Sequence, residues 1–400
     1  MQAVDLPELK VSAYSITSCL GVGSADSFQG ILDGHSALAP VGNSLGIDFS
    51  CYLGVVDEVE DCHLPCNLRH YDCRNNRLAH ITLEADGFAD KARCAVERYG
   101  SHRVGLFVGT STSGIAATEN AYANRQSDGQ LPAYNLHCTH SLGSLLEFVA
   151  ESLGISGPAQ TISTACSSSA KVFAAAQRHI ACGLCDAAVV GGVDSICLTT
   201  LYGFNSLQLI SSLPARPWGR SRDGISIGEG GGFALLERVQ SGDKGVRLKG
   251  CGESSDAYHM SSPHPQGEGA FIAINSALRA ARCAPEQIDY LNLHGTGTPS
   301  NDKAEDRAVT RVFGGSPWCS STKGNIGHTL GAAGVIEALL CCMALENSAV
   351  IGGVTEADLD PELATSKRFV THTKEMAIDH VASLSLGFGG SNCCLIFKGI

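Results

Sequence analysis

Cys166, His294 and His328 are the residues of this sequence whose types and settings best fit a catalytic reaction. Cys166 stands in the run Thr-Ala-Cys-Ser-Ser-Ser-Ala, His294 begins His-Gly-Thr-Gly-Thr-Pro, and His328 ends Lys-Gly-Asn-Ile-Gly-His. A thiol can accept an acyl group as a thioester, and two neutral imidazoles can polarise the carbonyl of a second thioester while it loses carbon dioxide. Together the three residues indicate carbon–carbon bond formation through thioesters.

The sequence around Cys166 predicts a sharp strand-to-helix turn. Residues 159–165 read as a short strand, and apolar residues recur at helical spacing from Ala170 to Ile180. Ser167 to Ser169 carry side chains typical of helix N-termini, so Cys166 is predicted to lie where a helix begins. The dipole and the free amides of that terminus favour a thiolate and offer a donor to an oxyanion.

The two histidines are followed by small residues that suit a narrow substrate channel. Gly295 and Gly297 let a thin substrate arm approach the backbone, and the hydroxyls of Thr296 and Thr298 can hydrogen-bond amide groups of that arm. Lys323 can pair with Glu305 and set the local field. Taken alone, Lys323 would be an ordinary surface lysine.

Composition and charge narrow the class of protein. The chain has 400 residues, of which 44% are hydrophobic and 17% charged, and this length predicts about two to three domains. The net charge of −12, from 28 basic and 40 acidic residues, argues against a general nucleic-acid binder. The longest apolar run, Val335 to Leu345, is too short to span a membrane and contains Glu337.

The 18 cysteines are scattered along the chain, and no apolar signal segment is visible at the start, so we expect reduced thiols in the cytoplasm. Most of them, Cys393 and Cys394 included, are expected to fill core positions. A zinc site at Cys62, His63, Cys66, His70 and Cys73 is disfavoured because two clean Cys-x-x-Cys pairs are missing. Cys182 and Cys185 match a redox motif by spacing only, and the Gly-rich runs lack a nucleotide-binding context.

A weak internal repeat predicts a duplicated α/β fold. Residues 104–109 resemble 288–293, and the strand and helix around Cys166 are echoed by residues 318–322 and 331–345. The strand 233–237 is echoed by 394–397. Strand–helix alternation in two similar halves indicates duplicated sheets, with a boundary near residues 241–245. We therefore expect one half at residues 1–243, which carries Cys166, and a second at 244–400, which carries His294, Lys323 and His328.

These motifs resemble those of the elongating β-ketoacyl-acyl-carrier-protein synthases (types I and II), members of the thiolase superfamily. The resemblance covers essentially the whole chain. It also includes Arg222-Asp-Gly, Gly228-Glu-Gly, Ser255-Asp-Ala-Tyr-His-Met260, Asp302-Lys-Ala-Glu305 and Gly387-Phe-Gly-Gly-Ser-Asn392. It implies a thiolase-like fold with five layers, α/β/α/β/α, and a decarboxylative Claisen condensation between an acyl thioester and malonyl-acyl-carrier protein. Initiating synthases resemble the chain less, because they carry Asn where His328 stands.

The resemblance also implies residue roles. Cys166 would carry the acyl group, His294 and His328 would serve decarboxylation, and Lys323 with its acidic neighbour Glu305 would support them. Phe388 would be a gating aromatic whose backbone amide joins that of Cys166 in an oxyanion hole. Thr296, Thr298, Thr112 and Phe204 are expected to contact substrate.

For one feature, a structural cation site, an alternative stays open. Asn292, Glu337, Ser383 and Asn392 match positions where some relatives hold a structural monovalent cation, or else they form a buried hydrogen-bond network. No catalytic metal and no cofactor are expected, since the substrates ride on the phosphopantetheine arm of the acyl-carrier protein.

The partners follow from the same resemblance. The family often has a basic residue in the loop after Phe204, but this chain has none there. An acyl-carrier protein is therefore expected to dock on other basic residues. The candidates are Arg69, Arg74, Arg77, Arg216 and Arg220. The small residues Thr110 to Gly114 predict a long acyl pocket and leave open a polyene or polyketide ketosynthase. We expect a homodimer, or a heterodimer with a chain-length-factor-like homologue. A non-catalytic subunit is disfavoured because the nucleophile is present.

Overall fold

The computed structural model describes residues 6–41 and 45–399, and its central feature is a sheet made of two copies of one five-strand pattern. The halves meet where the first strand of each pairs, at Leu9–Leu248 and Lys10–Arg247. In order across the sheet, the N-terminal half is β6 (Ala159–Ile162), β5 (Val104–Gly109), β7 (Ala187–Asp194), β9 (Gly230–Arg238) and β1 (Leu9–Ser18). The C-terminal half continues with β10 (Arg247–Ser255), β16 (Ser391–Lys398), β15 (His380–Gly387), β11 (Tyr290–Asn292) and β12 (Trp318–Ser320).

The two halves share one topology. β5 is parallel to β6 and β7, and β7 is antiparallel to β9; β11 is parallel to β12 and β15, and β15 is antiparallel to β16. The segments predicted to be repeats therefore hold equivalent positions in the two halves: β5 corresponds to β11, β6 to β12 and β9 to β16. This confirms the duplicated α/β architecture. The connection between β9 and β10, residues 239–246, contains the segment where the boundary was expected.

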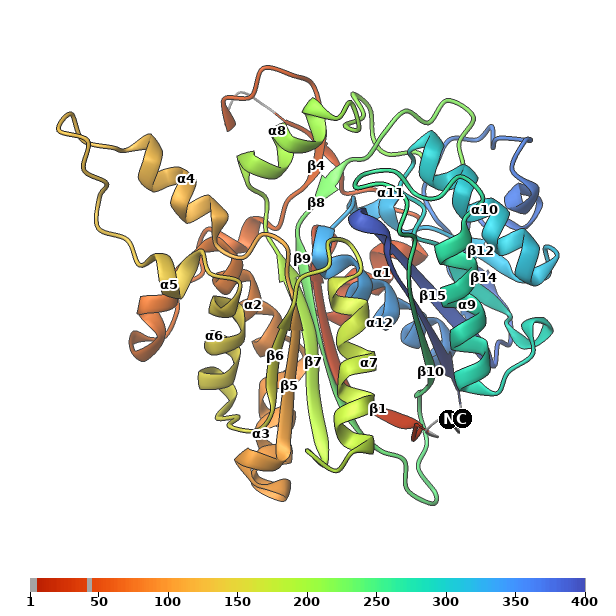
Figure 1. Cartoon of the computed structure of the whole chain (residues 1–400), viewed down its shortest axis with the longest axis horizontal. Coiled ribbons are helices and arrows are strands. Elements are labelled where there is room, and N and C mark those ends of the chain that lie inside the picture. Colours follow the sequence, from red (N-terminus) through yellow and green to blue (C-terminus); the bar gives the residue numbers. More distant parts are fainter. Residues whose placement is uncertain (1–5, 42–44, 400) are drawn as a thin grey trace.

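The helices and the two half-sheets form five layers, α/β/α/β/α, with two buried helices in the middle layer (Figure 1). α7 (Ser168–Ala181) contacts β5, β7, β10 and β16, and α12 (Ala333–Glu346) contacts β9 and β15, so both lie between the two half-sheets. The outer layers are α2 (Arg74–Glu84), α3 (Phe88–Tyr99) and α6 (Gly143–Leu153) on the N-terminal half. On the C-terminal half they are α9 (Glu268–Ala281) and α10 (Pro299–Phe313).

The sequence of the middle layer explains its position. Thirteen of the 14 residues of α12 are buried, and a helix that is apolar on every side can only be an interior helix. This is the run that was too short to cross a bilayer. β7 is likewise buried along its whole length, as expected for a strand covered by helices on both faces. No helix in the described part of the chain is long and apolar enough to span a membrane.

Small residues let the middle helices approach each other and the sheet. A Cβ at Gly334, in α12, would lie 2.4 Å from the backbone nitrogen of Ala170 in α7. A Cβ at Gly109 would lie 2.5 Å from the backbone nitrogen of Ser169, and one at Gly192 would lie 2.5 Å from the Ser169 Cβ. The N-terminal ends of both helices are thereby brought together at one edge of the sheet.

The remaining elements surround this framework. The segment that carries α4 and α5 projects from the N-terminal half (Figure 1). The minor helices are α1 (Ser24–Leu32), α4 (Ile115–Ala123), α5 (Leu136–Thr139), α8 (Leu198–Ser206) and α11 (Lys323–Ile326). The minor strands are β2 (Gly21–Val22), β3 (Ala39–Pro40), β4 (Tyr52–Gly54), β8 (Ile227–Gly228), β13 (Ala349–Val350) and β14 (Lys374–Glu375).

We predict that Gly334→Ala lowers the free energy of unfolding by about 1–3 kcal/mol, because the new methyl group must displace the backbone of α7. Chemical denaturation measures this change. The matched control is Gly203→Ala in α8, where a Cβ would meet nothing within 4 Å, so the substitution should be neutral or stabilising by about 0.5–1 kcal/mol. Equal effects at the two positions would show that the α7–α12 contact is not tight.

Candidate active site

Cys166 lies on the sharp turn between β6 and α7, as the sequence predicted. The turn depends on Ala165, which adopts a left-handed conformation with φ of 53°. Ser167 and Ser168 donate their hydroxyls to the carbonyls of Thr164 and Ala165, and Ser169 Oγ accepts from Val335 N of α12 at 2.9 Å. The expectation that these serines cap the helix is wrong: their hydroxyls hold the turn and join the two middle helices instead.

The thiol of Cys166 is almost completely buried, and this decides its protonation. Burial raises the pKa of the thiol to about 11, although the Lys323 charge and the backbone N–H groups of Phe388 and Cys166 oppose the rise. The expectation that the helix terminus favours a thiolate is therefore wrong, because loss of hydration outweighs the Lys323 charge and the two backbone N–H groups. The same two N–H groups are directed at the sulfur, where an oxyanion hole was expected.

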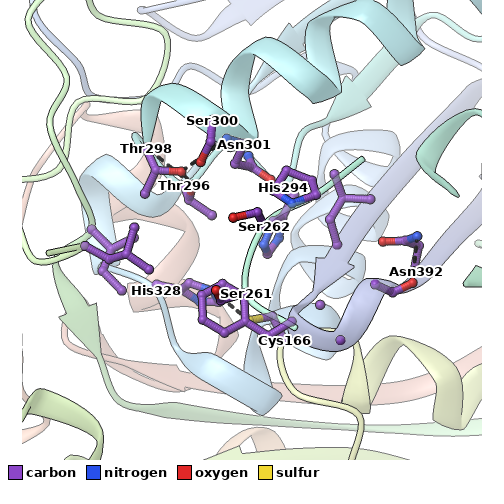
Figure 2. Close-up of a pocket in the computed structure, with 18 of the residues that line it drawn as sticks. Cys166, Ser261, Ser262, His294, Thr296, Thr298, Ser300, Asn301, His328 and Asn392 are labelled. Atoms are coloured by element: carbon purple, nitrogen blue, oxygen red, sulfur yellow. Dashed lines mark hydrogen bonds between the residues drawn. The ribbon is translucent and has the colours of Figure 1, made fainter. Parts of the chain in front are cut away.

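His328 contacts the nucleophile directly (Figure 2). Its Nε2 lies 3.1 Å from Cys166 Sγ, and its Nδ1 accepts a hydrogen bond from Leu330 N at 3.2 Å. A nitrogen that accepts carries no proton, so the neutral ring holds its proton on Nε2. Burial and the Lys323 charge hold the pKa of His328 well below its ordinary value, which keeps the ring neutral.

His294 is held in the same state by a different neighbour. Its ring lies 5.2 Å from that of His328, centroid to centroid, at 82°. Lys323 Nζ donates to the His294 carbonyl at 2.5 Å and lies 3.5 Å from Nδ1, which again assigns the proton to Nε2. Burial, Lys323 and His328 together lower the pKa of His294 well below its ordinary value. Two neutral imidazoles thus present Nε2–H donors beside one thiol.

Lys323 pairs with Glu337 and not with Glu305, which corrects the sequence-based assignment. Both side chains of the Lys323–Glu337 pair are about 2% exposed. Glu305 instead accepts from the backbone nitrogens of His294 at 2.6 Å and Gly295 at 2.8 Å, and burial raises its pKa to about 8. Glu305 therefore holds the loop that carries His294, while Glu337 compensates the buried ammonium. Lys323 and Glu337 lie in different elements, α11 and α12, so no local spacing rule marks the pair.

The Cys–His–His arrangement does not fit a metal. Within the described residues it is the one group of three Cys, His or acidic side chains with potential ligand atoms within 4.8 Å of one another. Metal-bound imidazoles donate their second nitrogen to an acceptor. Here Nδ1 of both rings faces a donor, Leu330 N–H or the Lys323 ammonium. Of the residues weighed for zinc, Cys62 donates its thiol to the Arg77 carbonyl.

The three residues line one pocket with most of the predicted substrate contacts. Thr296 and Thr298 lie on its wall and bond each other at 2.9 Å, and the rings of Phe204 and Phe388 lie 5.5 Å apart at the cysteine side. Figure 2 shows polar groups that sequence reasoning had not singled out: Ser261, Ser262, Ser300 and Asn301. The two serines directly follow the Ser-Asp-Ala-Tyr-His-Met motif, which was the available signal for them.

Thr112 lies apart from the other predicted substrate contacts, and its contact with substrate stays a prediction. It is wholly buried and lies outside the lining of this pocket, and both its N–H and its hydroxyl donate to Asp194 Oδ1 at 2.9 Å. The loop after β5 has small side chains because it folds around the buried carboxylate of Asp194.

The predicted cation residues are only partly brought together. Asn292 and Ser383 are direct neighbours on β11 and β15, and Asn292 Oδ1, Ser383 Oγ and Glu337 Oε2 are buried without a hydrogen-bond partner. Asn392 bonds Asp256 Oδ1 at 2.7 Å instead and belongs to the pocket wall. Three of the four residues thus offer orphaned oxygens that suit a cation, and the cation remains a prediction.

The predicted docking arginines are mostly engaged. Arg74 is bound through two nitrogens to the buried carboxylate of Glu229, at 2.5 and 2.8 Å, so it is a structural brace and not a docking residue. Arg77 pairs with Asp72, and Arg216 with Asp223. Arg69 and Arg220 are exposed, and Arg220 lies 3.1 Å from Asp358.

Comparison with known proteins identifies the family. The models "Beta-ketoacyl synthase, N-terminal domain" and "Beta-ketoacyl synthase, C-terminal domain" match residues 78–241 and 246–354. The 3-oxoacyl-[acyl-carrier-protein] synthase 2 of Vibrio harveyi is 30% identical over 98% of each chain, and that of Synechocystis is 28% identical over 100% of this chain and 99% of its own. The chain belongs to the β-ketoacyl synthase family of the thiolase superfamily, as an elongating, acyltransferase-type condensing enzyme.

Solved structures agree with this assignment. A ketosynthase (ApeO) from Xenorhabdus doucetiae, in complex with its chain length factor (ApeC), is 37% identical, with a TM-score of 0.91 over 98% of each chain. A β-ketoacyl synthase from Burkholderia phymatum STM815 is 22% identical and shares the fold, with a TM-score of 0.86 over 99% of this chain and 100% of its own. The thiolase-like fold is confirmed.

We predict that iodoacetamide labels Cys166 slowly at pH 7 and that the rate rises roughly tenfold per pH unit up to pH 9, because the buried thiol must first ionise. Peptide mapping by mass spectrometry measures the rate, and Cys166→Ala identifies the peptide. The exposed Cys66, Cys94 and Cys182 should be labelled first at pH 7. A Cys166 rate that levels off below pH 8 would contradict the buried, protonated thiol.

Proposed function

We propose that this enzyme lengthens an acyl chain carried on Cys166 by two carbons taken from malonyl-acyl-carrier protein. The observation that carries the proposal is the grouping of one buried thiol with two neutral imidazoles in a single pocket, where one reactive atom of each residue lies within 4.8 Å of the others. An acid–base dyad would need a charged or titrating imidazole, whereas two neutral donors suit the stabilisation of an oxyanion.

In the first step the Cys166 sulfur attacks the thioester carbonyl of the acyl-carrier protein. The bond from acyl carbon to the carrier sulfur breaks, a new thioester forms on Cys166, and the thiol proton ends on the leaving sulfur. The N–H groups of Cys166 and Phe388 are positioned to stabilise the negative charge on the carbonyl oxygen.

In the second step malonyl-carrier protein replaces the free carrier. Nε2–H of His294 and of His328 donate to the malonyl thioester oxygen, the carbon–carboxylate bond breaks, and carbon dioxide leaves. The resulting enolate carbon attacks the acyl carbonyl on Cys166. The Cys166 sulfur then leaves and takes up one proton, which gives β-ketoacyl-carrier protein. Thr296, Thr298, Ser261 and Ser262 line the approach and suit the amides of a pantetheine arm.

One observation favours a second function, that of a ketosynthase in a polyene or polyketide pathway. The 37% identical ketosynthase was solved with a chain length factor, so this chain can also be the catalytic half of a ketosynthase pair in a polyene or polyketide pathway. Two structural features support a partner chain of either kind. β6 is an edge strand with exposed residues, and the α4–α5 segment exposes Tyr122, Leu136 and Leu142.

The proposal also includes the location of the enzyme in the cell and the docking of its carrier protein. All 18 cysteines are free in the structure, and reduced thiols support a cytoplasmic location. Arg69 and Arg220, the exposed members of the arginine set, support docking of an acidic carrier protein.

We predict that acyl transfer and decarboxylation separate. Cys166→Gln should abolish condensation but retain decarboxylation of malonyl-carrier protein, since an amide imitates the acylated thiol and both imidazoles remain. His294→Ala or His328→Ala in that background should slow decarboxylation by roughly 10²–10³-fold.

Because burial keeps the pKa of both imidazoles low, decarboxylation should persist below pH 6.5 and fail only in stronger acid.

Carbon dioxide release and mass spectrometry of the carrier protein measure the two reactions. Cys182→Gln is the matched control, because Cys182 is exposed and far from the pocket lining; it should keep full condensation. Loss of decarboxylation in Cys166→Gln itself, or an unchanged rate in both histidine variants of that background, would refute this division of roles.

We predict that the purified chain alone converts acyl- and malonyl-carrier protein to β-ketoacyl product as a homodimer. Light scattering gives the assembly state, and intact-mass analysis of the carrier gives the product. A chain that is inactive alone and gains activity with a homologue lacking the cysteine would favour the paired ketosynthase over the fatty-acid-type enzyme.

A further inference from the structure

Asp194 is a wholly buried carboxylate that the proposed reaction does not use. It is the last residue of β7 and lies at the end of that strand, where the N-terminal ends of α7 and α12 meet. In the described part of the chain its partners are hydroxyls and backbone N–H groups, with no Lys, Arg or His among them. A buried carboxylate without a cation must be compensated by hydrogen bonds, so the groups that donate to it are held firmly.

The donors to Asp194 come from two separate loops. The loop after β5 supplies Thr110 Oγ1 at 2.6 Å, Ser111 N at 2.8 Å, and Thr112 N and Oγ1, both at 2.9 Å. The loop before α12 supplies Gly331 N at 2.6 Å. One side chain of the N-terminal half thus binds the backbone of the C-terminal half, three residues after His328.

The approach of the two loops leaves no room for adjustment. A Cβ at Gly331 would lie 2.7 Å from Asp194 Oδ2 and 2.7 Å from Ser111 Oγ. Ser111 Oγ in turn donates to the carbonyl of Ala165, at 3.4 Å, beside the nucleophile. The carboxylate therefore reaches the backbone next to Cys166 through Ser111 and the backbone next to His328 through Gly331.

The duplicated fold provides an internal comparison. Ala165 and Leu330 have the same left-handed conformation, with φ of 53° and 52°, and each lies three residues before its middle helix, α7 or α12. In the N-terminal half the next N–H belongs to Cys166 and is directed at the catalytic sulfur. In the C-terminal half the next N–H belongs to Gly331 and is bound by Asp194. The second turn has the shape of a nucleophile turn but serves to hold a loop.

That loop determines the state of His328. Leu330 N is the donor that makes Nδ1 of His328 an acceptor and so leaves the proton on Nε2, 3.1 Å from the sulfur. The orientation of Leu330 N depends on its left-handed backbone, which is costly for a residue other than glycine and persists only when neighbours impose it. The Asp194–Gly331 bond fixes the very next peptide group.

We propose that Asp194 is a positioning residue that, through Gly331 and Leu330, fixes the tautomer and orientation of His328 against Cys166. The proposal rests on the proposed function insofar as it assigns a use to His328. Loss of Asp194 should then weaken the histidine-dependent step without affecting substrate affinity, because Asp194 lies outside the pocket lining.

The first test measures decarboxylation of malonyl-carrier protein in the Cys166→Gln background. Asp194→Asn, which keeps the shape and removes the charge, should lower kcat by about 10- to 100-fold with KM within about twofold, because a small misplacement of a catalytic group has an effect of this size. The matched control is Asp306→Asn. Asp306 is also buried and accepts from one loop, through Thr365 N and Oγ1 and Ala364 N, and none of these residues bonds His328 or its loop. It should retain kcat.

The second test reads the tautomer without any activity. In protein labelled with ¹⁵N-histidine, the ring signals of His328, assigned among the 14 histidines with His328→Ala, should show an unprotonated Nδ1 and a protonated Nε2. In Asp194→Asn the two forms should mix. An unchanged spectrum with unchanged kcat, or equal losses of kcat in the Asp194 and Asp306 variants, would overturn the proposal.

Gly331→Ala serves if Asp194→Asn does not fold, because its methyl group would lie 2.7 Å from Asp194 Oδ2 and push the carboxylate away from Gly331 N while Asp194 itself is kept. The same loss of kcat and the same mixed tautomer are expected, and a wild-type result in both would overturn the proposal. A Cys166→Gln protein without decarboxylation would refute the proposed function, while the histidine signals would still decide the role of Asp194.

Discussion

The close contact of the two middle helices is the constraint on which the rest of the structure depends. Because Gly334 lets α12 approach the backbone of α7 at Ala170, the N-terminal ends of both helices arrive at the same point of the sheet edge. One end presents Cys166 and the other follows His328, so residues 162 positions apart in the chain come into contact. The layers outside these helices, α2, α3 and α6 on one half and α9 and α10 on the other, bury the opposite faces of the half-sheets.

Burial at this point sets the chemistry of the site. Away from water the neutral forms of thiol and imidazole are favoured, so Cys166 is protonated and both histidines are uncharged. The positive charge of Lys323 beside them is paired with the Glu337 carboxylate, and it strengthens the preference of the imidazoles for neutrality. Breaking such a pair leaves an uncompensated buried charge, which is strongly destabilising. The ion pair is therefore both a structural element and the source of the local field.

Duplication supplied two similar turns that now do different work. The turn at Ala165 leaves an N–H free to act at the reacting carbonyl, and the turn at Leu330 gives its N–H groups to His328 and Asp194. A symmetric framework thereby holds an asymmetric site, in which one half provides the nucleophile and the other provides both imidazoles. The polar wall of the pocket, from Thr296 to Asn301 and from Ser261 to Ser262, comes from the half that does not carry the nucleophile.

The sequence alone determined the order of the duplicated halves and the Cys–His–His set, because both depend on local patterns: apolar runs of strand and helix length, and small residues beside the reactive ones. The same local reasoning placed Thr296 and Thr298 at the pocket, whereas Phe388 and Phe204 were placed there by the resemblance to the synthase family. Only the tertiary structure decided that the Cys166 thiol stays protonated, that Lys323 pairs with Glu337, that Thr112 binds Asp194, and that Arg74 is a brace for Glu229. Each of these depends on desolvation or on a partner from a distant element, such as the 137 positions that separate Asp194 from Gly331. Local sequence patterns do not encode the sum of such contacts; the packed interior does.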